Sequence, residues 1–341
     1  MLPHIPAKIA AARQCIYQNH LVLKSMLDWL SSDLGAPEPL CYASTAAAAW
    51  ATAHGNKVNP MDADKVMYVL KNVVRDWSAD GEEERSESYG RILAELLPLL
   101  SLSSSTDKQQ PPRVLVPGCG LGRLCAELAS AGCDALGNEH SYYMLMASAF
   151  ALNAFTREEQ FALFPWVHTC NNHTNNGDQL RPVTVPDTVP ATLIENKHEN
   201  TNLNTQGMLG MAAGDFVQVF NDEEFAGSFD AVATCFFIDT AHNFIDYLEV
   251  IYKVLRPGGY WVNLGPLQWH WSDAHTYLPG EELSIEVCSE DVVHVAQRIG
   301  FEFIKKESGI RCRYMCNDRS MLRQEYQCAL FVCCKPHNKD C

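Results

Sequence analysis

Residues Val114-Leu-Val-Pro-Gly-Cys-Gly-Leu-Gly-Arg123 decide the fold of this chain. An apolar run of strand type leads directly into Gly118, Gly120 and Gly122, and helical apolar spacing follows. Glycine lets the backbone approach a ligand closely at such a turn, and the N-terminus of the helix offers free N–H groups. Tight strand-to-helix turns also use glycine for structural reasons alone, so the motif needs support from elsewhere in the chain.

The pattern on both sides of this turn alternates between short apolar runs and stretches with helical spacing. We expect strands at 113–116, 133–137, 229–238, 260–264, 301–304 and 326–334, and helices at 121–131, 142–152 and 242–255. This alternation predicts an α/β fold in which helices cover a parallel sheet. The stretch 165–206 is rich in Asn, Thr and Pro without clear periodicity, so it is a lid, an inserted subdomain or a disordered segment.

The first hundred or so residues predict helices rather than strands. In 65–77 the apolar side chains fall on one helix face, and a second apolar stripe begins at Tyr89 and ends near Pro98. The polar, proline-terminated stretch 101–112 has the composition of a linker. We therefore divide the chain into a helical N-terminal region, 1–105, and an α/β domain, 106–341, with the insert at 165–206.

Composition narrows the class of protein. The chain has 341 residues, of which 47% are hydrophobic, so it can bury a sizeable core. Its 41 acidic and 26 basic side chains leave a formal charge of −15, which argues against a nucleic-acid partner. No apolar run approaches the roughly 20 residues that span a bilayer, and no signal-peptide core is seen. We expect a soluble protein without a membrane partner, in the cytoplasm, with the nucleus left open.

The 14 cysteines predict packing thiols rather than a metal site. They are scattered, and many lie in apolar runs, where a free thiol behaves as a small hydrophobic side chain. Cys312 and Cys316, with Cys328 later, have the only spacing that resembles metal ligands, and no CxxC pair accompanies them. We expect no bound metal.

Three further motifs indicate the ligand of the glycine turn. Glu139 ends the second expected strand, 17 residues after Gly122, where a carboxylate can accept hydrogen bonds from both hydroxyls of a ribose. Asp215 and Phe216 follow a Met-rich apolar run and would place a carboxylate and a ring beside an adenine. Val254-Leu-Arg-Pro-Gly-Gly-Tyr-Trp261 closes a helix and opens a strand. With the glycine turn, these motifs resemble the class I S-adenosylmethionine-dependent methyltransferases, which implies a Rossmann-like fold and S-adenosylmethionine as the cofactor.

The acceptor site should follow the fourth core strand, since ligands bind at the carboxyl ends of parallel strands. The sequence there is Ala233-Thr-Cys-Phe-Phe-Ile-Asp-Thr-Ala-His-Asn243. It lacks the Asn-Pro-Pro-Tyr signature of many methyltransferases that act on DNA or amide nitrogen, and it places Asp239 near the expected position. A carboxylate suits an acceptor with an N–H group, such as imidazole. The alternative is that Asp239 is the N-cap of the helix that begins near His242.

Longer motifs resemble one narrow family, the carnosine N-methyltransferases, whose members methylate Nδ1 of the histidine imidazole in carnosine to give anserine. The resemblance covers most of the chain. Its specific stretches include Leu70-Lys-Asn-Val-Val-Arg-Asp-Trp-Ser78, Asn138-Glu-His-Ser141, Phe164-Pro-Trp-Val-His168, Thr234 to Asn243 and Gly265-Pro-Leu-Gln-Trp-His270. The resemblance implies an enzyme whose substrate is a small histidine-containing dipeptide.

The same resemblance implies roles for individual residues. Asn72 and Arg75 would contact the methionine end of the cofactor, with Arg75 on its carboxylate, although the family usually has Gln where this chain has Asn72. The other cofactor positions are Gly118, Gly120, Glu139, Asp215, Phe216 and Cys235. The dipeptide-binding positions are Asp239, His270, Tyr326 and Tyr314. Of these, Tyr314 lies in the stretch, 313–326, that departs most from the family pattern.

The expected chemistry follows from the two nitrogens of neutral imidazole, of which only the unprotonated one can attack. If Asp239 accepts a hydrogen bond from Nε2–H, Nδ1 faces the sulfonium methyl, and Asp239 is the catalytic residue. His270 and Tyr326 also have structural interpretations, as a satisfied histidine and as a packing aromatic. Two other functions stay open, a protein histidine N-methyltransferase and a catalytically silent cofactor-binding scaffold, and so does a homodimer.

Overall fold

The computed structural model describes residues 5–33, 60–103, 110–196, 203, 205–273 and 283–337. The chain forms two compact units, each assembled from separate stretches of sequence. Unit 1 consists of 1–84, 142–192 and 315–324, and unit 2 of 85–141, 193–314 and 325–341. The division of the chain at residue 105 stays a prediction.

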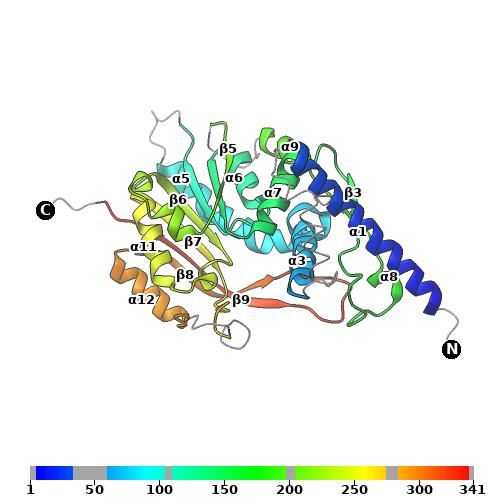
Figure 1. The fold of residues 1–341 in the computed structure, drawn as a ribbon. Coiled ribbons are helices and arrows are strands. Elements are labelled where there is room, and N and C mark those ends of the chain that lie inside the picture. The colour runs from blue at the N-terminus through cyan, green and yellow to red at the C-terminus, as the bar shows by residue number, and fades with distance from the viewer. Residues whose placement is uncertain are drawn as a thin grey trace, which may run out of the picture. The chain divides into compact units, whose positions relative to one another are not determined.

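Unit 2 contains a seven-stranded sheet in the order β5-β2-β1-β6-β7-β9-β8 (Figure 1). All neighbouring strands from β5 to β7 pair in parallel, whereas β9 runs antiparallel to both β7 and β8. The strands are β1 (Arg113–Pro117), β2 (Asp134–Glu139), β5 (Met208–Ala213), β6 (Phe229–Cys235), β7 (Leu255–Gly265), β8 (Glu302–Arg313) and β9 (Glu325–Cys334). This mostly parallel sheet confirms the predicted α/β, Rossmann-like fold.

Two apolar layers cover the two faces of the sheet, because successive side chains of a strand point to opposite faces. In β1, Val114 and Val116 belong to one layer and Leu115 to the other. Helices α5 and α6 contribute to the first layer, and α10, α11 and α12 to the second. The helices of unit 2 are α5 (Arg91–Ser103), α6 (Arg123–Ser130), α10 (Phe216–Phe220), α11 (Phe244–Val254) and α12 (Ser289–Ile299), with the short turns η3 (Ser86–Gly90), η4 (Glu223–Phe225) and η5 (Ile238–Thr240).

The strand order reverses at β1, which has β2 on one side and β6 on the other. In an open α/β sheet, ligands bind outside the carboxyl ends of the strands at such a reversal. Gly118 follows the carboxyl end of β1, Glu139 ends β2, and Phe236 and Asp239 follow β6. The fold therefore gathers the candidate ligand-binding residues of unit 2 at one end of the sheet.

Unit 1 is built around the helices α1 (Ile5–Asp33), α3 (Pro60–Trp77) and α7 (Tyr142–Ala154). α7 packs against both α1 and α3, and Trp77, at the end of α3, is fully buried. β3 (Phe161–Leu163) and β4 (Val183–Val185) form a two-stranded antiparallel sheet. The remaining short helices are η2 (Ala79–Gly81), α4 (Glu82–Arg85) and α8 (Asn176–Gln179), and α9 (Pro190–Glu195) begins in unit 1 and ends in unit 2. Within the described ranges, no helix is both long and apolar enough to cross a membrane.

Helix α5 corrects one predicted boundary. The helix continues through Pro98 to Ser103, so its predicted end near Pro98 is wrong. Leu96 and Leu100, on either side of the proline, are 0% and 2% exposed. Burying both leucines against the sheet outweighs the one backbone hydrogen bond that proline cannot make.

The insert predicted at 165–206 is described at 165–196, 203, 205 and 206, and its other positions lie outside the described residues. It contains α8, β4 and α9, and β4 pairs with β3, which precedes the insert. The Asn175 side chain caps α8 by accepting a hydrogen bond from the Asp178 amide at 2.9 Å. Among the three interpretations of this segment, these elements favour an inserted subdomain.

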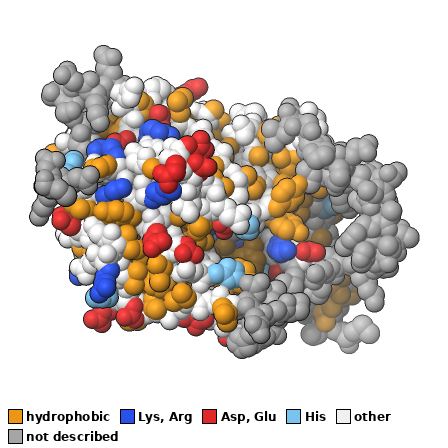
Figure 2. Space-filling model, turned by 60° about the vertical axis from the view of Figure 1, so that its left-hand side comes forward, with side chains coloured by type: hydrophobic (Ala, Val, Ile, Leu, Met, Phe, Trp, Pro, Cys, Tyr) orange, Lys and Arg blue, Asp and Glu red, His pale blue; other side chains and the backbone are white. Residues whose placement is uncertain are grey.

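Charged side chains of both signs are interspersed on the face shown in Figure 2, where Lys and Arg lie among Asp and Glu. In unit 2, for example, Lys305 Nζ lies 2.6 Å from Glu95 Oε1. Exposed pairs of this kind contribute little to stability, because water screens them. The net negative charge of the chain is therefore not gathered into a single acidic surface on this face.

Candidate functional site

The glycine turn after β1 adopts a backbone conformation that only glycine takes readily. Gly118, Gly120 and Gly122 have φ values of +63°, +58° and +80°. A Cβ atom on Gly118 would also lie 2.6 Å from Cδ2 of Phe237, which is closer than any real contact. The backbone conformation of the turn therefore favours glycine at all three positions, and at Gly118 the close Phe237 ring excludes a side chain as well.

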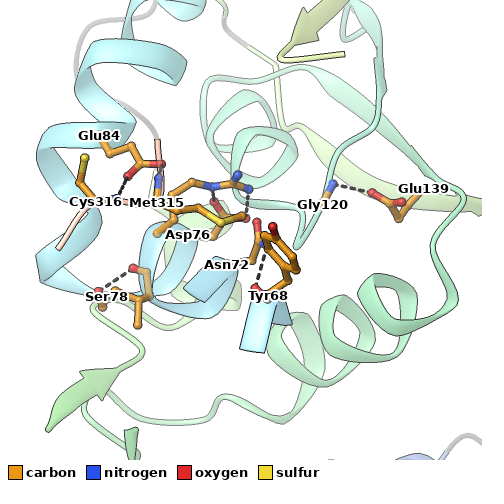
Figure 3. Close-up of polar contacts among 11 residues, drawn as sticks. Tyr68, Asn72, Asp76, Ser78, Glu84, Gly120, Glu139, Met315 and Cys316 are labelled. Atoms are coloured by element: carbon orange, nitrogen blue, oxygen red, sulfur yellow. Dashed lines mark hydrogen bonds and ion pairs between the residues drawn. The ribbon is translucent and has the colours of Figure 1, made fainter. Parts of the chain in front are cut away.

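Glu139 is fixed beside this turn by three backbone amides. Its Oε2 accepts a hydrogen bond from Gly120 N at 3.1 Å (Figure 3), and its Oε1 accepts from His140 N at 2.9 Å and Ser141 N at 2.8 Å. Burial raises the pKa of the Glu139 carboxyl, and these amide hydrogen bonds oppose that rise. A carboxylate held in this way keeps acceptor capacity for the hydroxyl groups of a ligand.

Asp215 and Phe216 lie at the start of α10 and have structural contacts of their own. Asp215 is the N-cap of α10, since its Oδ1 accepts a hydrogen bond from Gln218 N at 2.9 Å. The Phe216 ring is 2% exposed and packs edge-on against Phe237 and Tyr247, with both centroids 5.4 Å away. The carboxylate therefore shapes the turn after β5, and contacts of this pair with adenine stay a prediction.

Asp239 lies in η5, just beyond β6, and is 3% exposed. Its Oδ2 accepts a hydrogen bond from Gln268 N at 2.9 Å, and its backbone oxygen accepts one from His270 N, also at 2.9 Å. Its Oδ1 is buried without a hydrogen-bond partner among the described residues. Burial raises the pKa of the Asp239 carboxyl, and the Gln268 amide and the nearby His270 oppose that rise. The site thus presents one unsatisfied carboxylate oxygen.

The N-cap interpretation of Asp239 is wrong. Helix α11 begins at Phe244, and its N-cap is Asn243, whose side-chain oxygen accepts a hydrogen bond from Ile245 N at 3.1 Å. Asp239 lies before this helix, in a separate short turn. Its carboxylate therefore has no part in capping α11.

An aromatic cluster made of Phe236, Tyr314 and Tyr326 lies at the same end of the sheet. Phe236 stacks on Tyr314 with centroids 5.1 Å apart, and Tyr326 meets Phe236 edge-on at 5.9 Å. The Tyr326 hydroxyl donates a hydrogen bond to Oε1 of Gln268. Tyr326 is therefore more than a packing aromatic, because its polar end is linked to the residue that holds Asp239.

His270 and Cys235 occupy the edges of this arrangement. The His270 side chain is exposed, so it is not a core histidine, and its backbone is tied to Asp239. Cys235 is half-buried at the last position of β6. Cys235 directly precedes Phe236 of the aromatic cluster in sequence, and His270 lies beyond the end of β7, two residues after Gln268.

The two predicted cofactor residues of unit 1 lie on α3. Arg75 forms a bidentate ion pair with Asp76, Nε to Oδ1 at 2.7 Å and Nη2 to Oδ2 at 3.1 Å, and only 15% of its side chain is exposed. It is therefore not a solvated helix charge. The amide nitrogen of Asn72 donates to Tyr68 O at 2.8 Å (Figure 3), so the buried side chain of Asn72 is held against its own helix.

Glu84, one short helix further along unit 1, binds a distant segment of the same unit. Its carboxylate accepts hydrogen bonds from Met315 N at 2.9 Å and Cys316 N at 3.2 Å (Figure 3). Met315 has a φ of +50°, an uncommon value for a residue with a side chain. Burial raises the pKa of Glu84, and the positive charge of Arg75 opposes that rise.

The cysteines that resembled metal ligands are free thiols. Cys312 and Cys328 are fully buried on the paired strands β8 and β9, and the Cys316 thiol donates to Gln324 O at 3.0 Å. Within the part of the chain that the structure describes, no three His, Cys, Asp or Glu side chains are grouped to hold a metal ion.

Comparison with known proteins gives the family. The model of the carnosine N-methyltransferase family matches residues 53–337. The carnosine N-methyltransferase of Rattus norvegicus is 35% identical to this chain in an alignment that covers 98% of this chain and 77% of the rat protein. The chain belongs to the carnosine N-methyltransferase family.

Other relatives in this family are as similar or more so. The carnosine N-methyltransferase of Schizosaccharomyces pombe is 41% identical over 79% of this chain and 70% of its own length. The carnosine N-methyltransferase unmet of Drosophila melanogaster is 42% identical over 82% of this chain and 57% of its own length.

Solved structures are much more distant. A putative methyltransferase complexed with the Haloferax volcanii Trm112 activator has 14% identity and a TM-score of 0.43 over 79% of this chain and 96% of the solved chain. The magnesium protoporphyrin IX methyltransferase of Synechocystis, with bound SAH, has 11% identity and a TM-score of 0.39 over 75% and 86%. The assignment to the carnosine N-methyltransferase family therefore rests on the sequence matches.

The structure also brings forward residues that sequence reasoning did not single out, namely Glu84, Asn138, Phe236 and Gln268. Asn138 donates to Ala212 O at 3.2 Å and Gly214 O at 3.0 Å, and so joins the carboxyl ends of β2 and β5. Asn138, Phe236 and Gln268 lie inside the stretches on which the family resemblance is based. Phe236 has a φ of +53°, a strained value for an aromatic residue that is often found at functional sites.

Proposed function

We propose that this protein transfers a methyl group from S-adenosylmethionine to Nδ1 of the imidazole in carnosine, giving anserine, and acts on related histidine-containing dipeptides. Membership of the carnosine N-methyltransferase family supports the reaction class. The observation that carries the proposal for the ring position is the buried Oδ1 of Asp239, which has no hydrogen-bond partner among the described residues. A buried acceptor of this kind is costly unless a ligand supplies the donor.

The residues around the glycine turn fit the proposed cofactor. The turn at Gly118 tolerates no side chain, since a Cβ atom there would lie 2.6 Å from the Phe237 ring, so its backbone stays uncovered for a ligand. Glu139 keeps acceptor capacity for ribose hydroxyls beside Gly120. In unit 1, the guanidinium of Arg75 suits a carboxylate, as at the methionine end of the cofactor. When bound, S-adenosylmethionine supplies an electrophilic methyl on its sulfonium sulfur. The protein has only to place the acceptor nitrogen in line with that methyl.

Asp239 selects which imidazole nitrogen reacts. Neutral imidazole carries one N–H and one free lone pair. When Oδ1 of Asp239 accepts the hydrogen bond from Nε2–H, the lone pair is on Nδ1. Methylation at Nδ1 places a positive charge on the ring, which the adjacent carboxylate stabilises. The Nε2 proton then passes to the Asp239 carboxylate and from there to water, which gives the neutral product.

The aromatic cluster contributes orientation. Phe236, Tyr314 and Tyr326 form an aromatic cluster, and the Tyr326 hydroxyl is bonded to Gln268, whose backbone amide holds Asp239. Aromatic rings around a bound imidazole restrain the plane of its ring, and exclusion of water strengthens the hydrogen bond to the carboxylate. The backbone amide of His270 donates to the backbone oxygen of Asp239, and the His270 side chain is exposed, so it is accessible to a bound dipeptide.

The test is methyl transfer from labelled S-adenosylmethionine to carnosine by the purified protein. We expect label in the dipeptide, with free histidine as the poor-acceptor control. The Arg75→Ala variant should transfer far less label at limiting cofactor. Absence of transfer to carnosine, together with label in histidine residues of proteins in a lysate, would overturn the dipeptide assignment and favour a protein acceptor.

A further inference from the structure

Gln268 connects the two polar groups of the candidate acceptor site in unit 2. Its backbone amide donates to Oδ2 of Asp239 at 2.9 Å, and its side-chain Oε1 accepts a hydrogen bond from the hydroxyl of Tyr326. The backbone contact does not depend on the nature of the side chain, whereas the Tyr326 contact does. The contact with Tyr326 therefore fixes the orientation of the Gln268 amide group through its Oε1 atom.

The other polar atom of the same amide group, Nε2, is a hydrogen-bond donor without a partner among the described residues. Among the described residues, Nε2 of Gln268 forms no hydrogen bond, and the side chain is exposed. Because Oε1 is engaged by Tyr326, the group that Gln268 offers to a ligand is the NH₂, which donates and does not accept. The complementary ligand group is an oxygen acceptor, and an ammonium group is excluded.

Carnosine offers an amide carbonyl and a carboxylate as oxygen acceptors, and the carboxylate forms the stronger hydrogen bond with a neutral donor. In carnosine, the histidine carboxylate lies two carbons from the ring, so a ring held by Asp239 brings a second negative charge close to the first. A Lys or Arg side chain at this position would also pair with Asp239 and offset its charge. The neutral amide of Gln268 can bind the dipeptide carboxylate without doing so.

We propose that Gln268 recognises the carboxylate of the acceptor dipeptide through its Nε2 group and thereby sets the preference for free dipeptides over acceptors that lack this carboxylate. The proposal rests on the proposed function, since it assigns a substrate contact within that reaction. Gln268 contacts the substrate away from the reacting nitrogen, so it determines specificity rather than chemistry.

The experiment compares two acceptors, carnosine and β-alanylhistamine, which has the same ring and amide but no carboxylate. Gln268→Met keeps the length of the side chain and the backbone amide that holds Asp239, and removes the donor. We expect KM for carnosine to rise about 10-fold or more, with kcat/KM for β-alanylhistamine changed much less. Gln297→Met, on the exposed surface of α12, is the matched control and should leave both acceptors unchanged.

A second pair of variants separates recognition from support of Tyr326. Tyr326→Phe removes the hydroxyl that donates to Oε1 and orients the amide of Gln268, so it should weaken transfer to carnosine more than transfer to β-alanylhistamine, but less than Gln268→Met does. Gln268→Glu replaces the donor by a second carboxylate, which repels the carboxylate of carnosine. The kcat/KM for carnosine should therefore fall further in Gln268→Glu than in Gln268→Met. Binding of S-adenosylhomocysteine should be the same in all Gln268 variants.

Equal losses for carnosine and β-alanylhistamine in Gln268→Met would overturn the inference and leave the proposed function standing. The same holds if the wild-type protein does not distinguish the two acceptors. A wild-type protein that binds S-adenosylhomocysteine and methylates neither compound would overturn the proposed function, and the role of Gln268 with it.

Discussion

One oxygen of the Asp239 carboxylate, Oδ2, accepts a hydrogen bond from the backbone amide of Gln268 at 2.9 Å, whereas the other, Oδ1, is buried without a partner among the described residues. The first contact fixes the plane of the carboxylate. The second oxygen is buried without a hydrogen bond among the described residues, which carries a desolvation cost. Carboxylates arranged in this way are expected where a ligand N–H is to be bound.

Replacement of Asp239 by Asn should abolish most of the activity. The side-chain oxygen of Asn can still accept the hydrogen bond from Gln268 N, which turns the NH₂ group toward the substrate. That group donates, so it stabilises the tautomer with the lone pair on Nε2 and the proton on Nδ1. We expect kcat for carnosine to fall by about 10²- to 10⁴-fold, with binding of S-adenosylhomocysteine unchanged in calorimetry. Near-normal turnover would refute the catalytic role.

The same variant should be more stable than the wild type at neutral pH. Burial raises the pKa of Asp239 above its ordinary value of 3.8, so the folded protein binds this proton more tightly than the unfolded chain. Stability is therefore lost as pH rises from 3.8 through the raised pKa and the carboxyl ionises. We expect the melting temperature of ligand-free Asp239→Asn to exceed that of the wild type at pH 8, and the difference to shrink as pH falls. A difference independent of pH would argue against ionisation of Asp239 as its cause.

Glu139→Gln should weaken cofactor binding. The substitution removes the charge that strengthens hydrogen bonds from ribose hydroxyls, and it turns an NH₂ group toward at least one of the amides that Glu139 now binds. We expect the Kd for S-adenosylhomocysteine to rise about 10- to 100-fold in calorimetry. Glu224→Gln, at an exposed carboxylate, is the control. If the two variants bind S-adenosylhomocysteine equally well, Glu139 does not contribute to cofactor binding.

Two glycine substitutions separate backbone strain from steric overlap. Gly309 has a φ of +76° and open space around it, so Gly309→Ala should cost about 1 kcal/mol for the left-handed conformation alone. Gly118→Ala has a similar φ and in addition places Cβ 2.6 Å from the Phe237 ring. Thermal denaturation should show a clearly larger loss for Gly118→Ala, accompanied by weaker binding of S-adenosylhomocysteine. The account fails here if Gly118→Ala is the milder change.

Glu84→Gln should loosen the segment that begins at Met315. Gln offers one acceptor oxygen in place of two, so one of the two amides that Glu84 binds loses its partner. We expect a loss of about 1–3 kcal/mol in the free energy of unfolding, with faster hydrogen exchange at the amides of Met315 and Cys316. Glu82→Gln, at an exposed position on the same helix, should leave both quantities unchanged. Unaltered exchange at the two amides in Glu84→Gln would show that these contacts do not hold the segment.

The core of the fold could be predicted because its strands and helices have strong and regular apolar patterns. β1, β2, β6 and β9 were expected within a few residues of their observed bounds. Helix α12 was missed because it has only two buried residues, Val292 and Ala296, among charged ones. The end of α5 was predicted too early, at Pro98, because the burial of Leu100, which sustains the helix beyond the proline, is not visible in the sequence.

The candidate site was predictable only where a residue belongs to a local motif. Glu139 follows the glycine turn at a fixed spacing, and Asp239 follows a strand end, so both could be found by reading along the chain. Gln268 could not, because it meets Asp239 across 29 positions of sequence through the connection that follows β7. The strained backbone of Phe236 is likewise a property of φ, which composition and periodicity do not reveal.

The most direct test of the central claim is the position of the transferred methyl group on the imidazole ring. The product from carnosine and methyl-labelled S-adenosylmethionine would be examined by heteronuclear NMR, in which the methyl protons correlate with the ring carbons next to the methylated nitrogen. If Asp239 holds Nε2–H, the methyl correlates with Cγ and Cε1, as in anserine. Correlation with Cδ2 and Cε1 would place the methyl on Nε2 and contradict the account.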